Sequence, residues 1–310
     1  MTPIDTLQFS ANELIRDYPP QWTFSKKKIV YNICCLTNDP FEGLITYSRW
    51  PTQDIPKAVL YNSRFSVLEG VYTYEGNSSS DEILWHVSFA DSDLFVAYGT
   101  ALLAQDELQV AEHPILGSVR EAVQSNALPA QTESVNGDPT PVTITGVQRR
   151  CAINTMPNPE LGLDKGLYGN LFFWASSNQI TKSVSLISPP SISNILAMAA
   201  PDGGEGEYRY DEITKILTIA YTGFLAARID TCRLLSANAK TIINTGFWGC
   251  GAFGGNRSLM TILQCLAADL AGVEIRFWAF DQAGGGGTCQ ECSRVVLSTA
   301  REYKQCFRYN

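Results

Sequence analysis

N-T-G-F-W-G-C-G-A-F-G-G-N, residues 244–256, separates two segments of different character. Residues 239–243 before it have the β-branched composition of a strand, and residues 257–271 after it place apolar side chains at helical spacing. The sequence thus predicts a strand, a glycine loop and a helix. Glycines let a backbone approach a ligand closely, and a helix N-terminus offers unpaired N–H groups and positive dipole, so the unit suits a phosphate group. Glycines also simply turn a chain, and the loop alone leaves both interpretations open.

The composition is that of an ordinary globular chain of 310 residues, with 45% hydrophobic and 17% charged residues. This length suits one large domain or two smaller ones. A net charge of -8 argues against an extended nucleic-acid surface, which needs clusters of Lys and Arg, and the run Lys26 to Lys28 is too short to change this. No apolar run reaches membrane-spanning length and the N-terminus lacks a secretory signal, so we expect a cytoplasmic protein without nucleic-acid or membrane partners.

Nine cysteines are scattered through the chain, and several lie on apolar faces, as free thiols do in a reducing compartment. Cys289 and Cys292 have C-x-x-C spacing behind the four glycines 284–287. A closed zinc site needs four ligands, and neither His86 nor His113 has a partner at suitable spacing. We therefore interpret the pair as part of a surface loop, and the sequence predicts neither a metal site nor a cofactor.

The first part of the chain shows little regular periodicity. Residues up to about 56 mix prolines, aromatics and charges, and are predicted to form an irregular, partly helical wrap. Residues 65–74 and 83–90 are typical of strands, with the polar residues 75–82 between them. These two strands are predicted to pair as a hairpin.

Acidic residues then gather at a strand end and at a helix start, namely Asp91, Asp93, Asp106 and Glu107. Helical spacing follows Glu107, and a second helix is expected near residues 118–124. Acids at such places are usually solvated and interact with the helix dipole, but an acid buried in a site can instead do chemistry.

Strands and helices alternate in the second half of the chain. The predicted strands are 142–147, 170–175, 184–187, 194–200 and 273–280. The predicted helices are Asp211 to about Ile229, 257–271 and 293–305. Polar loops are expected at 128–141 and 157–169. This alternation is typical of an α/β three-layer sandwich with a mixed sheet.

The run Thr245 to Asn256 closely resembles the glycine loop of poly(ADP-ribose) glycohydrolases, which reads T-G-N-W-G-C-G-A-F-G-G-D. A-Y-T-G-F-L at 220–225 is similar to the family's A-Y-C-G-F-L, and F-W-A-F at 277–280 follows at the matching distance. The family fold is a macrodomain that binds ADP-ribose, with this loop along the diphosphate and the last phenylalanine on the adenine. The resemblance therefore implies a substrate-binding set of Phe247, Gly249, Cys250, Gly251, Ala252, Phe253, Gly254, Gly255, Asn256 and Phe280.

Upstream motifs occur in the family's order. The family's F-A-N-R, then G-G-G and Q-E-E-I-R-F-L-I-N-P-E-L, looks like F-A-D at 89–91 and Q-D-E-L at 105–108, with H-P-I-L at 113–116. The second glutamate of that motif is the catalytic acid. The resemblance implies that role for Glu107.

The resemblance also implies a fold, because its motifs cover roughly residues 65–281. We predict a macrodomain-like three-layer α/β/α sandwich with a mixed central sheet over residues 61–310. An N-terminal, partly helical extension, residues 1–60, is expected to pack on this core.

Departures from the family pattern bear on the substrate. Phe-Val-Ala at 95–97 stands where the family has three glycines, so the diphosphate cannot be approached there in the same way. Asp91 replaces an asparagine, Asp106 the first glutamate, and Phe247 the asparagine of T-G-N-W. Only Tyr168 is a candidate remnant of the family's tyrosine-rich clasp. A hydrolase that clears a single ADP-ribose from a modified protein fits these changes at least as well as one that degrades the polymer.

The hypothesis is therefore an ADP-ribosyl hydrolase that acts on ADP-ribosylated protein or poly(ADP-ribose). Cleavage at the anomeric carbon needs an acid for the leaving group and tolerance of an oxocarbenium-like ribose. Glu107 is the predicted acid, if burial keeps its pKa near neutral. Asp106 would hold the ribose hydroxyls or orient Glu107, and Asp91 would bind the sugar or assist water.

Two alternatives stay open at this point. One is a reader that binds ADP-ribose without cutting it, which the lost glycines favour and the retained Q-D-E disfavours. The other keeps the fold without any ligand. The linkage that is cut and the oligomeric state do not follow from the residues.

Overall fold

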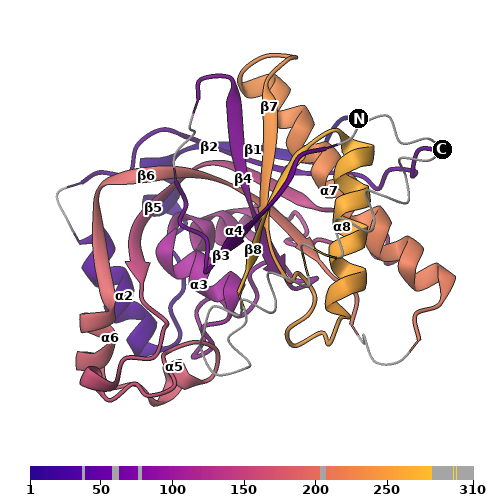
Figure 1. Cartoon of the computed structure of the whole chain (residues 1–310). Coiled ribbons are helices and arrows are strands. Elements are labelled where there is room, and N and C mark those ends of the chain that lie inside the picture. Colours follow the sequence, from indigo (N-terminus) through magenta and orange to yellow (C-terminus); the bar gives the residue numbers. More distant parts are fainter. Residues whose placement is uncertain are drawn as a thin grey trace.

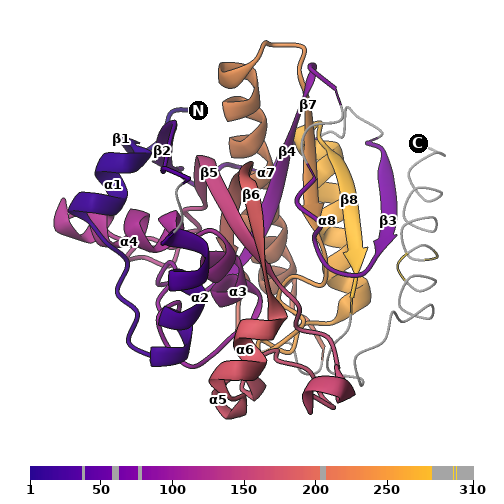
Figure 2. The ribbon, with the colours of Figure 1, turned by 90° about the vertical axis from the view of Figure 1, so that its left-hand side faces the viewer.

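The computed structural model describes residues 1–36, 39–57, 63–75, 79–202, 207–280, 296 and 298. Within them, one eight-stranded sheet has the order β1-β2-β5-β6-β4-β7-β8-β3, which can be followed from edge to edge in Figure 2. The strands are β1 (Asp5–Ser10), β2 (Leu44–Arg49), β3 (Phe65–Glu69), β4 (Glu82–Ala90), β5 (Val142–Ile153), β6 (Val184–Ala199), β7 (Lys240–Thr245) and β8 (Glu274–Ala279).

Helices cover both faces of this sheet (Figure 1). Helices α7 and α8 pack on one face, α1, α3 and α4 pack on the other, and α2, α5 and α6 gather around the far end of β5. The helices are α1 (Ala11–Asp17), α2 (Ser25–Cys35), α3 (Gln105–Glu112), α4 (Ile115–Ser125), the 3-10 helix η1 (Pro159–Leu161), α5 (Leu171–Trp174), α6 (Ser177–Ser183), α7 (Tyr210–Leu234) and α8 (Arg257–Ala271). The predicted three-layer sandwich with a mixed sheet is confirmed.

The parallel part of the sheet defines one functional edge. Strands β6, β4, β7, β8 and β3 run parallel, with Ala90 of β4 beside Ala199 of β6 and Thr245 of β7 beside Phe277 of β8. Their carboxyl ends therefore meet at the same edge. In α/β proteins this edge is the usual place for a ligand.

Strand β4 is central, and this overturns the predicted hairpin. Nearly every residue of β4 is buried, because Trp85 and Val87 face α7 and α8 while His86 and Ser88 point to the opposite side. A strand buried on both faces lies inside a parallel sheet, whereas a short polar turn suggests a hairpin only locally. Strand β3 instead pairs parallel with β8 at the sheet edge.

Two predictions around β6 are also corrected. Residues 170–175 are not a strand, because Leu171–Trp174 forms the one-turn helix α5, in which Phe172 is the buried residue. The predicted strands 184–187 and 194–200 are halves of the single strand β6. Its two prolines are tolerated because β4 pairs with β6 only from Asn194 onward, which leaves an edge strand before that point.

The N-terminal residues contribute two strands that the sequence did not predict. Strand β1 pairs antiparallel with β2, and β2 pairs antiparallel with β5. Each of these strands has only six residues, and β1 alternates between half-buried and exposed side chains, so its pattern is faint. The division of the chain at residues 60 and 61 stays a prediction.

Three further points concern the predicted boundaries and segments. Helix α7 begins at Tyr210 behind an Arg209 N-cap, so Asp211 lies in its first turn and is not the cap. The predicted helix 293–305 falls outside the described residues except for Val296 and Ser298, which are helical, and Cys289 and Cys292 lie outside them. Among the described helices, none has both the length and the apolarity to cross a membrane.

Candidate active site

The glycine loop, residues 246–256, joins β7 to α8 at the functional edge. Both elements have the predicted type, and α8 has the predicted bounds. Trp248 anchors the loop from within, because it is fully buried and its Nε1–H donates to the Met198 carbonyl of β6 at 2.9 Å. The Gln264 amide of α8 donates to the Gly246 carbonyl at 3.1 Å. The loop is therefore held by the strand beside it and by the helix after it.

Two glycines of the loop are required by close packing. Gly249 has a φ of +74°, and a Cβ there would lie 2.6 Å from the Ala200 Cβ and 2.9 Å from the Met260 Cε. A Cβ at Gly255 would lie 2.7 Å from the carbonyl oxygen of Gly249. Any larger side chain at these positions would push the loop off its support.

The opposite side of the loop faces solvent. Gly251 would meet no atom within 4 Å if it carried a Cβ, so packing does not demand a glycine there. Ala252, Gly254 and Asn256 are exposed as well. The Asn256 side chain caps α8 by accepting from the Leu259 N–H at 3.0 Å. This side therefore offers bare backbone beside the positive end of a fifteen-residue helix.

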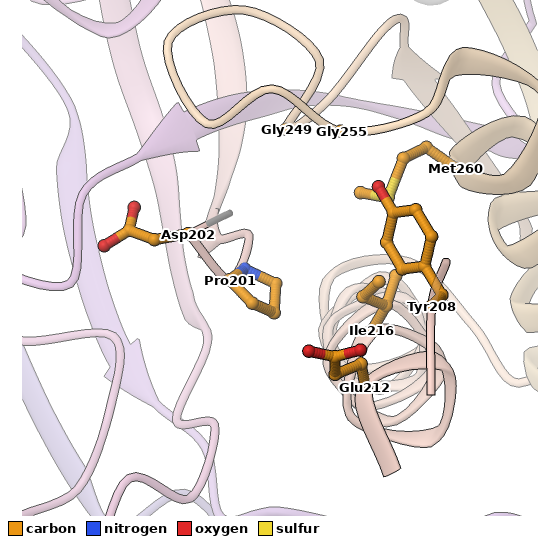
Figure 3. A pocket seen from close by; sticks show the side chains of 8 residues that line it. All are labelled: Pro201, Asp202, Tyr208, Glu212, Ile216, Gly249, Gly255 and Met260. Atoms are coloured by element: carbon orange, nitrogen blue, oxygen red, sulfur yellow. The ribbon is translucent and has the colours of Figure 1, made fainter. Parts of the chain in front are cut away.

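A small cavity of about 30 Å³ lies under the loop, between Pro201 and Asp202 on one side and α7 and α8 on the other (Figure 3). Gly249 and Gly255 border it, and the Tyr208 hydroxyl accepts from the Asn256 N–H at 2.7 Å. This volume is about that of one water molecule. A nucleotide would have to use the exposed side of the loop.

The acidic pair, Asp106 and Glu107, begins helix α3 on the other side of the functional edge. The side chain of Gln105 fixes this helix start on β4, accepting from the Phe89 N–H at 2.7 Å and donating to the Val87 carbonyl at 3.1 Å. Phe89 in turn reaches the glycine loop, since a Cβ on Gly246 would lie 3.6 Å from its ring. The acidic pair and the glycine loop are thus attached to the same stretch of β4.

Burial and mutual repulsion shape the chemistry of the acidic pair. Asp106 is 8% exposed and Glu107 is 3% exposed. Burial and the neighbouring charge of Glu107 raise the pKa of Asp106 well above its ordinary value. A Glu107 carboxylate oxygen accepts from the Ala104 N–H at 2.9 Å, which favours its charged form. The pair can therefore hold one proton at neutral pH, and in the resting state Asp106 carries it.

Two residues outside the predicted site face this pair. Lys27 of α2 is fully buried and interacts electrostatically with both carboxyl groups. Tyr168 lies near both carboxyl groups, which together with burial raise its pKa to about 12. Tyr168 was a candidate from the resemblance, whereas Lys27 was missed because a short basic run normally lies in solvent.

Asp91 follows β4 but serves its own turn. Its carboxylate accepts from the Asp93 N–H at 2.9 Å and from the Ser92 hydroxyl at 3.2 Å. Asp93 pairs with Arg120 of α4 at 2.5 Å. The catalytic roles of Glu107, Asp106 and Asp91 stay predictions.

The segment after β4 has a fold that glycine normally serves. Phe95 has a φ of +57°, in the left-handed region that side chains rarely adopt, and its ring is fully buried in the core under α4. Val96, next to it, is 46% exposed. The segment is therefore packed from inside and presents side chains outward, in contrast to a bare glycine loop.

The remaining predicted ligand contacts line the loop region. Phe247 packs edge-on against Phe277 at 5.2 Å, and the Arg257 guanidinium lies 4.8 Å from its ring centre. Phe253 is half-buried against the core of α7 and α8. Cys250 is partly buried, and burial raises the pKa of its thiol to about 12, so it is a poor nucleophile.

Phe280 stands at the end of β8 and is half-buried. Its backbone N–H donates to the Trp278 carbonyl at 3.1 Å, and the Trp278 indole donates to the Asn244 side chain at 3.0 Å. The predicted adenine-facing residue thus lies at the functional edge. Its contact with a ligand stays a prediction. Across the described residues, no three His, Cys, Asp or Glu side chains gather as a metal site would require.

This arrangement defines a macrodomain-type α/β protein with a glycine loop and a buried acidic pair at one sheet edge. Residues 165–284 match the family model described as poly(ADP-ribose) glycohydrolase, macro domain fold. The matched part includes Tyr168, the glycine loop and Phe280, and it confirms the resemblance inferred from the loop sequence. The acidic pair lies before the matched residues.

Solved structures with similarity to this chain include bacterial poly(ADP-ribose) glycohydrolases. The enzyme of Thermomonospora curvata is 14% identical with a TM-score of 0.48, over 95% of this chain and 85% of that one. A structure of that organism's enzyme with the inhibitor ADP-HPD is 16% identical with a TM-score of 0.45, over 77% and 78%. The enzyme of Deinococcus radiodurans in complex with ADP-ribose is 12% identical with a TM-score of 0.43, over 97% and 94%.

Proposed function

We propose that this chain is an ADP-ribosyl hydrolase. It cleaves the glycosidic bond at the anomeric carbon of ribose and releases ADP-ribose from a modified protein or from poly(ADP-ribose). The carrying observation is that the acidic pair and the glycine loop are tied to one stretch of β4. The family match over residues 165–284 supports this class of reaction.

Binding of ADP-ribose would use the exposed side of the glycine loop. Backbone N–H groups around Gly251 and Gly254 and the N-terminus of α8 suit the diphosphate, because they provide positive dipole without a charged side chain. Phe280 would pack on the adenine. The ribose would then lie toward β4 and the acidic pair.

Bond cleavage would use the single proton of the acidic pair. Glu107 delivers this proton to the leaving oxygen while the bond from the anomeric carbon to that oxygen breaks, and the bonding electrons stay on the oxygen. Water then attacks the oxocarbenium-like ribose and its proton returns to the pair. Asp106 keeps a proton available beside Glu107. Asp91 has the weaker role of contacting sugar or water, because its carboxylate already holds a turn.

A reader that binds without cutting is not favoured. Such a protein would gain nothing from burying two adjacent acids at the cost of their mutual repulsion, whereas an acid catalyst needs a group that retains a proton near neutral pH. Glu107 and Asp106 therefore favour turnover over binding alone.

The test is a panel of substrates, namely poly(ADP-ribose) and proteins carrying one ADP-ribose on serine, carboxylate or arginine, with released ADP-ribose measured by chromatography. Glu107→Gln should lower kcat by about 10² to 10⁴-fold, the usual contribution of a general acid. Glu13→Gln is the matched control, since Glu13 is also the third residue of a helix but is exposed on α1. It should leave kcat unchanged.

Calorimetry with free ADP-ribose completes the test. The hydrolase predicts that Glu107→Gln still binds ADP-ribose within about threefold of wild type, because the loop supplies most of the affinity. If the wild type binds ADP-ribose but releases none from any substrate of the panel, the protein is a reader and the proposal fails. If Glu107→Gln turns over as fast as the wild type, the acid lies elsewhere.

A further inference from the structure

A buried clasp connects the N-terminal part of the chain to the segment before α3. The Phe24 N–H and the Thr23 hydroxyl both donate to the Gly99 carbonyl at 2.9 Å. A Cβ on Gly99 would collide with the Gln21 carbonyl oxygen, so the two segments approach as closely as backbone allows. Helix α2 starts immediately after this contact.

Lys27, in the first turn of α2, points from this clasp into the protein. It is fully buried, and its ammonium donates to the Tyr98 carbonyl at 3.0 Å. The ring of Phe172 from α5 lies 5.8 Å from the ammonium. Its neighbours in the sequence differ, because Lys28 is exposed and Lys26 donates to the Phe173 carbonyl near the surface. Burying one lysine of three is costly without a charged partner.

The charged partners of Lys27 are Asp106 and Glu107. Burial lowers the pKa of Lys27 to about 8, and Glu107 and then Asp106 act against this by favouring the charged ammonium. From the other side, Tyr168 is the further titratable group near the two carboxyl groups, and it is neutral at pH 7. One ammonium, one carboxylate and one protonated carboxyl group together carry no net charge. A buried cluster of this kind is neutral when the acidic pair keeps a single proton.

We propose that Lys27 is a positioning residue for the hydrolase, whose buried ammonium fixes the number of protons on Asp106 and Glu107 at one. This inference rests on the proposed function. Without the ammonium, low-dielectric surroundings favour protonation of both carboxyl groups. The N-terminal part of the chain would then be needed for catalysis, although it provides no group that touches the substrate.

The activity test compares Lys27→Met with the matched control Lys28→Met, an exposed lysine one position away on the same helix. Both remove one positive charge, but only the first removes it beside the acidic pair. In Lys27→Met the acidic limb of the kcat profile should move upward by about one pH unit or more, because the remaining carboxylate gains a proton more readily. KM should change by less than about twofold, and Lys28→Met should reproduce the wild-type profile.

A uniform fall of kcat in Lys27→Met without movement of the pH profile would reduce Lys27 to a structural role and overturn the proposal. So would an equal movement in Lys28→Met. Restoration of the wild-type profile by Lys27→Arg, which keeps the charge, would support it.

A spectroscopic test requires neither turnover nor a folded Lys27 variant. The ammonium of Lys27 can be followed by nitrogen NMR in the wild type and in Glu107→Gln, with Glu13→Gln as control. Because Glu107 favours the charged lysine, its neutralisation should lower the pKa of Lys27 measurably, whereas Glu13→Gln should not. An unchanged lysine titration would overturn the proposal. If the wild type cleaves no ADP-ribosyl substrate, the proposed function fails, and this titration still decides whether Lys27 and the acidic pair are coupled.

Discussion

Two loops leave neighbouring parallel strands at the functional edge, and they solve the same backbone problem in opposite ways. The glycine loop after β7 bends at Gly249 with a φ of +74°, and the segment after β4 bends at Phe95 with a φ of +57°. At Gly251 the first loop leaves open space, whereas Phe95 fills the core with a fully buried ring. One loop is bare backbone for a ligand and the other is packed support.

The difference indicates how the work is divided at this edge. The segment after β4 provides the Tyr98 carbonyl that holds Lys27, and its Asp93 pairs with Arg120. It leads directly into the acidic pair. The diphosphate would therefore depend on the glycine loop alone, while the segment after β4 keeps the acids and their counter-charge in place.

The largest expected effect is on the supporting segment. Phe95→Gly should lower the free energy of unfolding by about 3 kcal/mol, because loss of a buried ring costs about 3 to 5 kcal/mol and relief of the left-handed backbone returns about 1. Val96→Gly, at an exposed position, should cost about 1 kcal/mol or less. Urea unfolding measures both. Equal losses in the two variants would show that the segment is not packed support.

The buried lysine gives the next effect, which depends on pH. The pKa of Lys27 is about 8 in the folded protein against 10.5 in the unfolded chain, so the unfolded chain binds more protons between these values. The stability of the wild type relative to Lys27→Met should therefore rise with pH across this window, by on the order of 3 kcal/mol. Unfolding at pH 7.5 and pH 10.5 measures it. Lys28→Met should show no such rise, and a rise in both variants would contradict the assignment.

Gly249→Ala tests the packed side of the glycine loop. The left-handed backbone and the clash with Ala200 and Met260 should together cost about 2 kcal/mol of stability, and ADP-ribose affinity should fall by more than about tenfold because the loop shifts. Adding Ala200→Gly should recover part of the stability, since it removes one clash but not the backbone strain. No recovery would mean that the loss arises elsewhere.

The parts of the fold that the sequence predicts well are those that depend on nearby residues. Strand β7, the glycine loop and helix α8 follow from composition and spacing within one continuous stretch. The hairpin between β3 and β4 was wrong because strand pairing is decided at a distance, by burial of β4 on both faces. The two halves of β6 were separated at prolines that an edge strand can carry.

The site shows the same limit. Gln105, Asp106 and Glu107 were found because they form one motif at a helix start. Lys27 was not found, since its burial depends on a contact with Tyr98, 71 positions away. Phe95 could be recognised as a departure from three glycines, but its left-handed backbone could not. Residues that act through distant packing leave no local pattern in the chain.

Gly251→Ala gives the smallest expected effect and separates ligand contact from folding. Its Cβ would meet no protein atom within 4 Å and its φ lies outside the left-handed region, so stability should change by less than about 0.5 kcal/mol. If the diphosphate lies against this backbone, the added methyl group should weaken ADP-ribose binding by about tenfold, or about 1.4 kcal/mol. Adenosine, which lacks the diphosphate, should bind the variant and the wild type equally. Calorimetry measures both ligands. Unchanged affinity for ADP-ribose would place the diphosphate away from Gly251, and an equal loss for adenosine would indicate a change in the adenine region instead.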